Sequence, residues 1–177
     1  AYADDVRLIE SQGAVGLEAT NSASISSTVA ALSAAVGVGG TAGIGAAIGI
    51  AVAQNTIGWQ PGAGSATPLL VHATLTDTAV TTPAALTIDA HADQTIQSLV
   101  VAGSVAIGAA GTVGLAIAGS GVYAENRIGV DVKSAIDGAG ATQIQAASVT
   151  LDADNDSSIH ALAGAAAVSA AFGGTVG

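Results

Sequence analysis

Large apolar side chains recur at every second position through three long, uncharged stretches of the chain. In residues 29–53, seven of the eight Val, Leu, Ile, Phe and Tyr residues carry even numbers. In residues 100–124, seven of nine carry odd numbers, and in residues 163–177 all three carry even numbers. Strand side chains alternate between two faces, whereas a helix would place such residues at both parities. The pattern therefore predicts long β-strands with one bulky aliphatic face and one face of Ala, Gly, Ser and Thr.

The alternating pattern is repeated, because three segments of the chain align with one another. Residues 15–58 align without a gap on residues 86–129 at an offset of 71, with 16 identities in 44 positions. Residues 86–114 align on residues 149–177 at an offset of 63, with 12 identities in 29. Such repetition is typical of arrays and fibres, in which each copy buries its apolar face against a neighbour. We therefore expect one continuous array over residues 1–177, with copies at 15–85 and 86–148 and a partial copy at 149–177.

Each copy is expected to contain the same sequence of elements. An alternating strand leads into a small-residue strand, a Gly-Thr turn and a second long strand that returns to an Asn. The turns are Gly40-Thr41, Gly111-Thr112 and Gly174-Thr175, and the returning strands end at Asn55 and Asn126. Shorter alternating strands follow at residues 71–75 and 132–136. Residues 59–68 are present in one copy alone and predict a surface loop.

The small-residue faces are the predicted assembly surfaces of this all-β chain. Both strand faces are apolar enough to be buried, which predicts a repetitive β-solenoid or a stacked-sheet fibre. The residues expected at contacts between copies are Ala35, Gly37, Thr41, Ala106, Gly108, Thr112, Asn55 and Asn126. For the two Asn residues a ligand contact is the alternative to a ladder between stacked copies or a bond to turn backbone. Residues 21–58 and 94–123 are also long enough to cross a bilayer as helices, but the parity of their apolar residues disfavours membrane insertion.

Composition and charge exclude several classes of function. Half of the 177 residues are apolar, yet there are only one Phe, one Trp and two Tyr beside 24 Gly. Thirteen acids against three bases give a net charge of −10, which argues against a nucleic-acid partner. The absence of Cys excludes disulfides and thiolate metal sites and fits an extracellular protein. The absence of Met suggests a segment of a longer chain.

The most site-like run lies at the start of the third copy. Asp152, Asp154 and Asp156 alternate as in a calcium loop, although the Gly and Glu that an EF-hand requires are missing. The alternative is a solvated strand end whose acids prevent unwanted edge pairing. The three His residues lack metal-like spacing and are interpreted as polar surface. No nucleophile elbow or phosphate-binding loop is present, so the chain is not expected to be an enzyme or to hold a cofactor other than calcium.

The apolar–acid–Ala strand, small-residue tract, Gly-Gly-Thr-x-Gly turn and terminal Asn-x-Ile resemble repeats of very large bacterial surface proteins. These are the filamentous adhesins and haemagglutinin-like exoproteins, including the leukotoxin-type filamentous adhesin family. The resemblance implies secretion to the bacterial cell surface and an extended β-solenoid stalk with an attachment role. We therefore expect an extracellular structural protein that assembles with itself, head to tail by strand addition, and that meets a host or cell-surface ligand. A calcium-dependent adhesion module and a membrane-embedded segment are the alternatives.

Overall fold

The computed structural model describes residues 1–60, 65–138 and 143–175, and within them every regular element is a β-strand. The all-β prediction is therefore confirmed. The strands are β1 (Tyr2–Asp4), β2 (Ile9–Glu10), β3 (Val15–Gly39), β4 (Ala42–Ile57), β5 (Leu69–Thr76), β6 (Val80–Thr81), β7 (Ala85–Ala110), β8 (Val113–Ile128), β9 (Val130–Asp137), β10 (Ile144–Gln145), β11 (Ser148–Asn155) and β12 (Ser158–Gly173). None of the described segments forms a helix with the length and apolar character that crossing a membrane requires.

The long strands begin and end where the repeat pattern predicts. β3 has 25 residues and is followed, after Gly40 and Thr41, by the 16 residues of β4. β7 and β8 are joined in the same way through Gly111 and Thr112. The shorter strands β5 and β9 include the predicted ranges 71–75 and 132–136. Ala and Gly have a low intrinsic preference for strands, so the prediction of strands here depends on the alternation of large and small residues.

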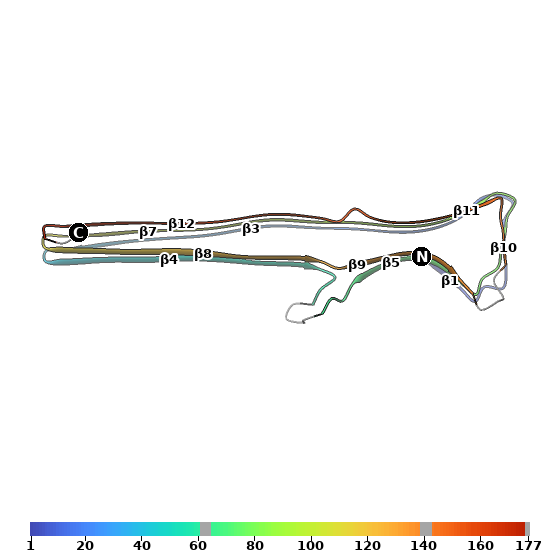
Figure 1. The fold of residues 1–177 in the computed structure, drawn as a ribbon, viewed down its shortest axis with the longest axis horizontal. Helices are drawn as coiled ribbons and strands as arrows, with labels where there is room; N and C mark the ends of the chain where they lie inside the picture. The colour runs from blue at the N-terminus through green and yellow to red at the C-terminus, as the bar shows by residue number, and fades with distance from the viewer. Residues whose placement is uncertain (61–64, 139–142, 176–177) are drawn as a thin grey trace. The chain divides into compact units, whose positions relative to one another are not determined.

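Strands of successive copies pair with one another in parallel, and the pairing follows the sequence offsets. Ile9 of β2 lies opposite Val80 of β6, which matches the offset between the first and second copies. Ser148 of β11 lies opposite Ala85 of β7, which matches the offset between the second and third copies. The turns follow the same register, since Gly111 N donates to Gly40 O at 3.1 Å. Equivalent residues of neighbouring copies are therefore hydrogen-bonded neighbours, and Figure 1 shows β3, β7 and β12 side by side.

The extra residues 59–68 leave the register of the sheet as a loop. Gly129 N donates to Ile57 O at 2.8 Å, while Gly129 O accepts from Leu69 N at 3.0 Å. Gly58 has a φ of 66°, and a Cβ there would lie 1.9 Å from Gly129 O, so this exit from the strand requires glycine. The predicted loop is confirmed for its described residues, and residues 61–64 lie outside the described part.

The described chain forms two compact units, each of which takes a segment from every copy. Unit 1 consists of Ala1–Ser24, Thr56–Thr95 and Arg127–Ile159. Unit 2 consists of Ile25–Asn55, Ile96–Asn126 and His160–Gly177. Twelve of the thirteen acids and all three bases belong to unit 1, whereas Glu125 is the one Asp, Glu, Lys or Arg of unit 2. The two units therefore differ sharply in charge, although the same copies build both.

Unit 1 has a core of ordinary aliphatic side chains. Leu75, Val80, Leu86 and Ile88 are fully buried. Partly buried apolar residues of neighbouring strands pack against this cluster, among them Leu17. Leu17 and Ile88 are equivalent positions of successive copies, so like residues stack on like residues in the core.

Unit 2 buries its small-residue face and exposes its aliphatic face. Its buried cluster contains Ala51, Ala53, Val100 and Ala102. The bulky residues on the opposite face of β4 are exposed instead, as Ile48 is 70% accessible. Within one chain, therefore, only the small-residue face of β4 is covered. Burial of the aliphatic face in an assembly stays a prediction. The layers meet through Ala and Gly because a small-residue face lets two backbones approach more closely than an aliphatic face does.

Candidate functional site

The predicted small-residue faces lie inside unit 2, at distances that exclude larger side chains. A Cβ on Gly37 would lie 1.9 Å from Ile44 O, and a Cβ on Gly108 would lie 2.0 Å from Leu115 O. Ala106 is fully buried, and Ala35 is half-buried. Gly37 and Gly108 therefore allow the two arms of each copy to approach each other closely within the chain, and Ala35 and Ala106 lie on the same face of the strands.

Asn55 and Asn126, the two predicted Asn residues, form a side-chain ladder between the first and second copies. Asn55 Nδ2 donates to Asn126 Oδ1 at 2.7 Å and to Ser27 Oγ at 2.9 Å, and Asn55 is only 7% exposed. Ser27 Oγ in turn donates to Ser98 Oγ at 3.3 Å. Buried amide and hydroxyl groups are costly unless paired, so this ladder favours one register between copies over its neighbours.

The Gly-Thr turns stack at the ends of the long strands. Val113 N donates to Thr41 O at 2.9 Å, and Thr175 N donates to Thr112 O at 3.1 Å. Both predicted residues, Thr41 and Thr112, have exposed side chains. Their backbones, rather than their side chains, therefore continue the ladder from copy to copy.

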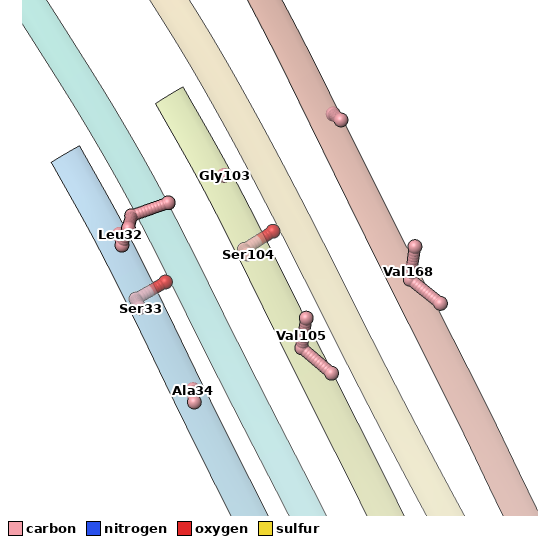
Figure 2. A pocket seen from close by; sticks show the side chains of 8 residues that line it. Leu32, Ser33, Ala34, Gly103, Ser104, Val105 and Val168 are labelled. Atoms are coloured by element: carbon pink, nitrogen blue, oxygen red, sulfur yellow. The ribbon is translucent and has the colours of Figure 1, made fainter. Parts of the chain in front are cut away.

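The outer aliphatic faces of unit 2 form an apolar surface. Leu32 is 85% exposed and Val168 is 60% exposed. A pocket on this surface is lined by residues of β3, β7 and β12, and Figure 2 shows the side chains that line it, among them Val105. Leu32 leans over Gly103, since a Cβ on that glycine would lie 2.9 Å from the Cδ2 atom of Leu32. Exposed aliphatic surfaces of this kind mark sites of association in other proteins.

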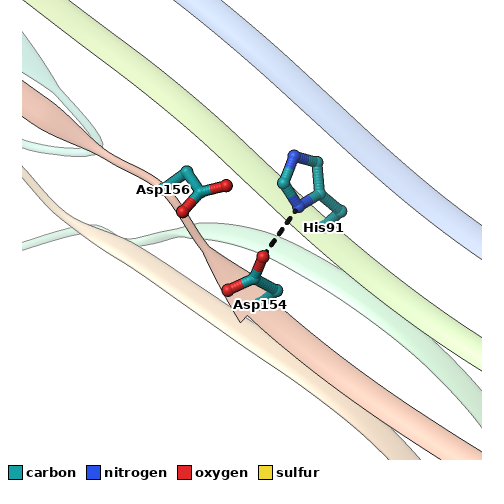
Figure 3. A group of neighbouring side chains, drawn as sticks. All are labelled: His91, Asp154 and Asp156. Atoms are coloured by element: carbon teal, nitrogen blue, oxygen red, sulfur yellow. Dashed lines mark ion pairs between the residues drawn. The ribbon is translucent and has the colours of Figure 1, made fainter.

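The acidic run contributes two of its three predicted residues to a cluster in unit 1. The ligand atoms of His91, Asp154 and Asp156 all lie within 4.8 Å of one another. His91 Nδ1 is 3.5 Å from Asp154 Oδ2, as the dashed line in Figure 3 indicates. Asp152 does not belong to this group and lies opposite Asp89 on the neighbouring strand.

His91 is the member of this cluster that the sequence interpretation missed. Spacing along the chain gives no indication of it, because His91 and Asp154 belong to different copies and are far apart in the sequence. Their separation equals the offset between the second and third copies, however, so the alignment places the two residues at equivalent positions. Comparing side chains across the offset, instead of along the chain, would have identified the pair.

His72 and Trp59, both expected at the surface, have side-chain partners in unit 1. His72 Nε2 lies 3.2 Å from Asp131 Oδ2, which makes a second His–Asp pair between neighbouring copies. The guanidinium carbon of Arg127 lies 4.9 Å from the ring centroid of Trp59, in cation–π geometry. Trp59 also takes part in an antiparallel bridge with Ala66, which favours an anchoring role in the loop.

No family model, no curated protein and no solved structure matches the chain.

Proposed function

We propose that this chain is a structural module of an extracellular bacterial filament or adhesin stalk, built as a β-solenoid with one coil per sequence copy. The observation that carries the proposal is the parallel register. Ile9 pairs with Val80 at the offset of 71, and Tyr2 pairs with Thr74 at a separation of 72 residues. Ser148 pairs with Ala85 at the offset of 63, and the pairs Val80–Ile144 and Leu69–Val130 have separations of 64 and 61 residues. Strand pairing thus follows the sequence repeat, and this agreement supports a solenoid.

The sheet edges supply the mechanism for head-to-tail assembly. Among the described residues, β3 and β12 both have β7 as their strand partner. The free edge of each strand therefore offers backbone donors and acceptors to a further copy, as in β-strand addition. An incoming copy would extend the Asn ladder, the stacked turns and the small-residue layers in the same register.

The extracellular and adhesive parts of the proposal rest on sequence. The repeat motif resembles those of filamentous adhesins, and a chain without Cys suits the bacterial cell surface. A host or cell-surface ligand would bind along the stalk, and repetition would present many equivalent positions to it.

Cysteine cross-linking tests the head-to-tail register, because the native chain contains no cysteine. The offsets make Thr28, Leu99 and Leu162 equivalent positions of the three copies, and all three side chains are exposed. In a head-to-tail filament, residue 162 of one chain would lie beside residue 28 of the next. Adjacent strands are about 4.8 Å apart, which is within the Cα separation of a disulfide.

A mixture of Thr28→Cys and Leu162→Cys chains is expected to form a mixed disulfide dimer under mild oxidation. Leu32→Cys mixed with Leu162→Cys is the matched control, because position 32 is also exposed but lies out of register with position 162. Equal cross-linking of both mixtures would contradict the proposed register. Electron cryo-microscopy of the native chain without detergent should show filaments with a repeat of about 4.8 Å, and a stable monomer at all concentrations would reject self-assembly.

The exposed aliphatic surface of unit 2 favours lipid contact as a second candidate function. Unit 2 contains a single Asp, Glu, Lys or Arg residue, Glu125. Unpaired strand edges are not tolerated in hydrocarbon, so insertion would require neighbouring copies to cover β3 and β12. Flotation with neutral phosphatidylcholine vesicles tests this candidate. Recovery of the chain with the vesicles would support lipid contact, whereas filaments that remain in the aqueous fraction would support the stalk.

A further inference from the structure

Three side chains able to ligate a metal lie close together in unit 1 where the second and third copies meet. We propose that His91, Asp154 and Asp156 bind a transition-metal ion of the Zn²⁺ class, and that the ion joins the two copies. The proposal does not depend on the filament, since all three residues belong to one chain and one unit.

Strand register brings the three ligands together. His91 on β7 lies directly opposite Asp154 on β11. Asp156 lies two residues further along, just beyond the end of β11, and its carboxylate is within 4.8 Å of the other two ligand atoms. Asp156 N donates to Ala92 O at 2.9 Å, which keeps this part of the third copy against β7. The cluster is therefore positioned by backbone ladders and not by the flexible side chains alone.

The separation of the ligand atoms suits a metal better than a direct hydrogen bond. His91 Nδ1 and Asp154 Oδ2 are 3.5 Å apart, longer than the usual distance of about 2.7–3.2 Å in an N–H···O bond. Two ligand atoms at about 2.0–2.1 Å from a tetrahedral Zn²⁺ lie roughly 3.3–3.4 Å from each other. The third ligand is within 4.8 Å of the others and is exposed, so a small side-chain rotation completes the set. A water molecule would take the remaining position on a bound ion.

The ligand set selects a transition metal over calcium. Calcium takes six to eight oxygen ligands, whereas this cluster offers one imidazole nitrogen and two carboxylates. Three protein ligands and one open position form a common zinc arrangement. Asp152, the third acid of the run, is outside the group. The proposed site thus differs from the sequence expectation of calcium at Asp152, Asp154 and Asp156 in both the ion and one of the ligands.

Among the described residues, the site occurs at one boundary between copies. At the boundary between the first and second copies the equivalent positions are Thr20, His91 and Asp93, and Thr20 is not a comparable metal ligand. An ion at this position adds a bridge between β7 and β11 that the other boundary lacks. Because the ion would bind the folded chain and not the unfolded chain, it should stabilise the fold by mass action.

Isothermal titration of the untagged 177-residue chain with ZnCl₂ tests the site. The expected result is one Zn²⁺ per chain and an increase in the thermal midpoint that grows with metal concentration. His91→Asn and Asp156→Asn should each lower the Zn²⁺ affinity at least tenfold. His72→Asn is the matched control, since it removes a His from the other stacked His–Asp pair, at 3.2 Å. Its Zn²⁺ affinity should equal that of the native chain.

Far-UV circular dichroism of each metal-free variant verifies that the strands are retained. Undiminished Zn²⁺ affinity in His91→Asn, or an equal loss in His72→Asn, would overturn the site. Tighter binding of Ca²⁺ than of Zn²⁺ would overturn the choice of metal. None of these outcomes bears on the cross-linking test of the filament, so the two proposals can fail separately.

Discussion

Adding one methyl group, by replacing Gly with Ala, should destabilise the chain on the buried face of unit 2 and not at an uncrowded position. Gly45 on β4 faces the backbone of β7, and a Cβ there would lie 2.3 Å from Ile107 O. Real Cβ atoms essentially never approach closer than 3.0 Å. Gly119 on β8 has no atom within 4 Å of the equivalent Cβ position. Neither glycine has a positive φ, so Gly45→Ala and Gly119→Ala differ chiefly in available space.

The magnitude follows from what the added methyl displaces. The obstacle at Gly45 is a backbone carbonyl and cannot rotate away, so the two layers must separate locally. A gap of about 0.5–1 Å already removes a quarter to a half of the attractive energy of each dispersion contact. Overpacking of this kind costs about 1–3 kcal/mol. Gly119→Ala should instead stabilise by up to about 1 kcal/mol, because alanine has less conformational entropy to lose.

Equilibrium unfolding in guanidinium chloride, followed by far-UV circular dichroism, measures the difference. Gly45→Ala should unfold at a lower denaturant concentration than Gly119→Ala, by roughly 0.5 M for a difference near 2 kcal/mol. Equal midpoints for the two variants would refute the close approach of the layers. A Gly119→Ala variant that is the less stable of the two would refute the assignment of inner and outer positions.

Three further substitutions test the burial pattern and the ladder. Ile50→Thr, at a 66% exposed position, should change the free energy of unfolding by less than about 0.5 kcal/mol. Ile88→Thr in the core of unit 1 should lower the free energy of unfolding by about 2–4 kcal/mol. Similar losses of stability in the two denaturation curves would contradict the exposure of the aliphatic face of unit 2. Asn55→Ala removes the donor to Asn126 Oδ1 and Ser27 Oγ, so it should lower the free energy of unfolding by about 1–3 kcal/mol. An unchanged free energy of unfolding in the same assay would mean that the Asn ladder does not hold the register between copies. Ala106→Leu should prevent both stable folding and assembly, as sedimentation velocity would show, and unchanged assembly would exclude the small-residue face from that role.

Much of the strand arrangement could be predicted from residue patterns alone. Alternation assigned β3, β4, β7 and β8 to strands because side-chain direction in a strand has a period of two. The offset between the first two copies anticipated the pairing of Ile9 with Val80. Equivalent residues have equivalent shapes and hydrogen-bonding groups, so stacking like on like is the pairing that satisfies every copy at once.

Alternation could not decide which face of a strand lies inside. It assigns Ile48 and Ile50 to one face and Gly45 and Ala47 to the other, but either face can pack against a partner. Experience with aliphatic cores places the bulky face inside, and that expectation holds for Leu86 and Ile88 in unit 1. In unit 2 the layers approach to backbone contact, and only the Gly and Ala face permits that distance.

The sequence by itself determined the strands, their repetition and the register between copies, because these depend on local alternation and on the similarity of the copies. The tertiary structure decided which faces are buried, where charge is concentrated and which distant side chains meet. His91 and Asp154 illustrate the division. Their equivalence was present in the alignment, but their approach to 3.5 Å depends on the packing of one copy on the next. Whether a strand face is buried, and which side chains meet, depends on two packed surfaces. The sequence of one strand specifies only one of those two surfaces.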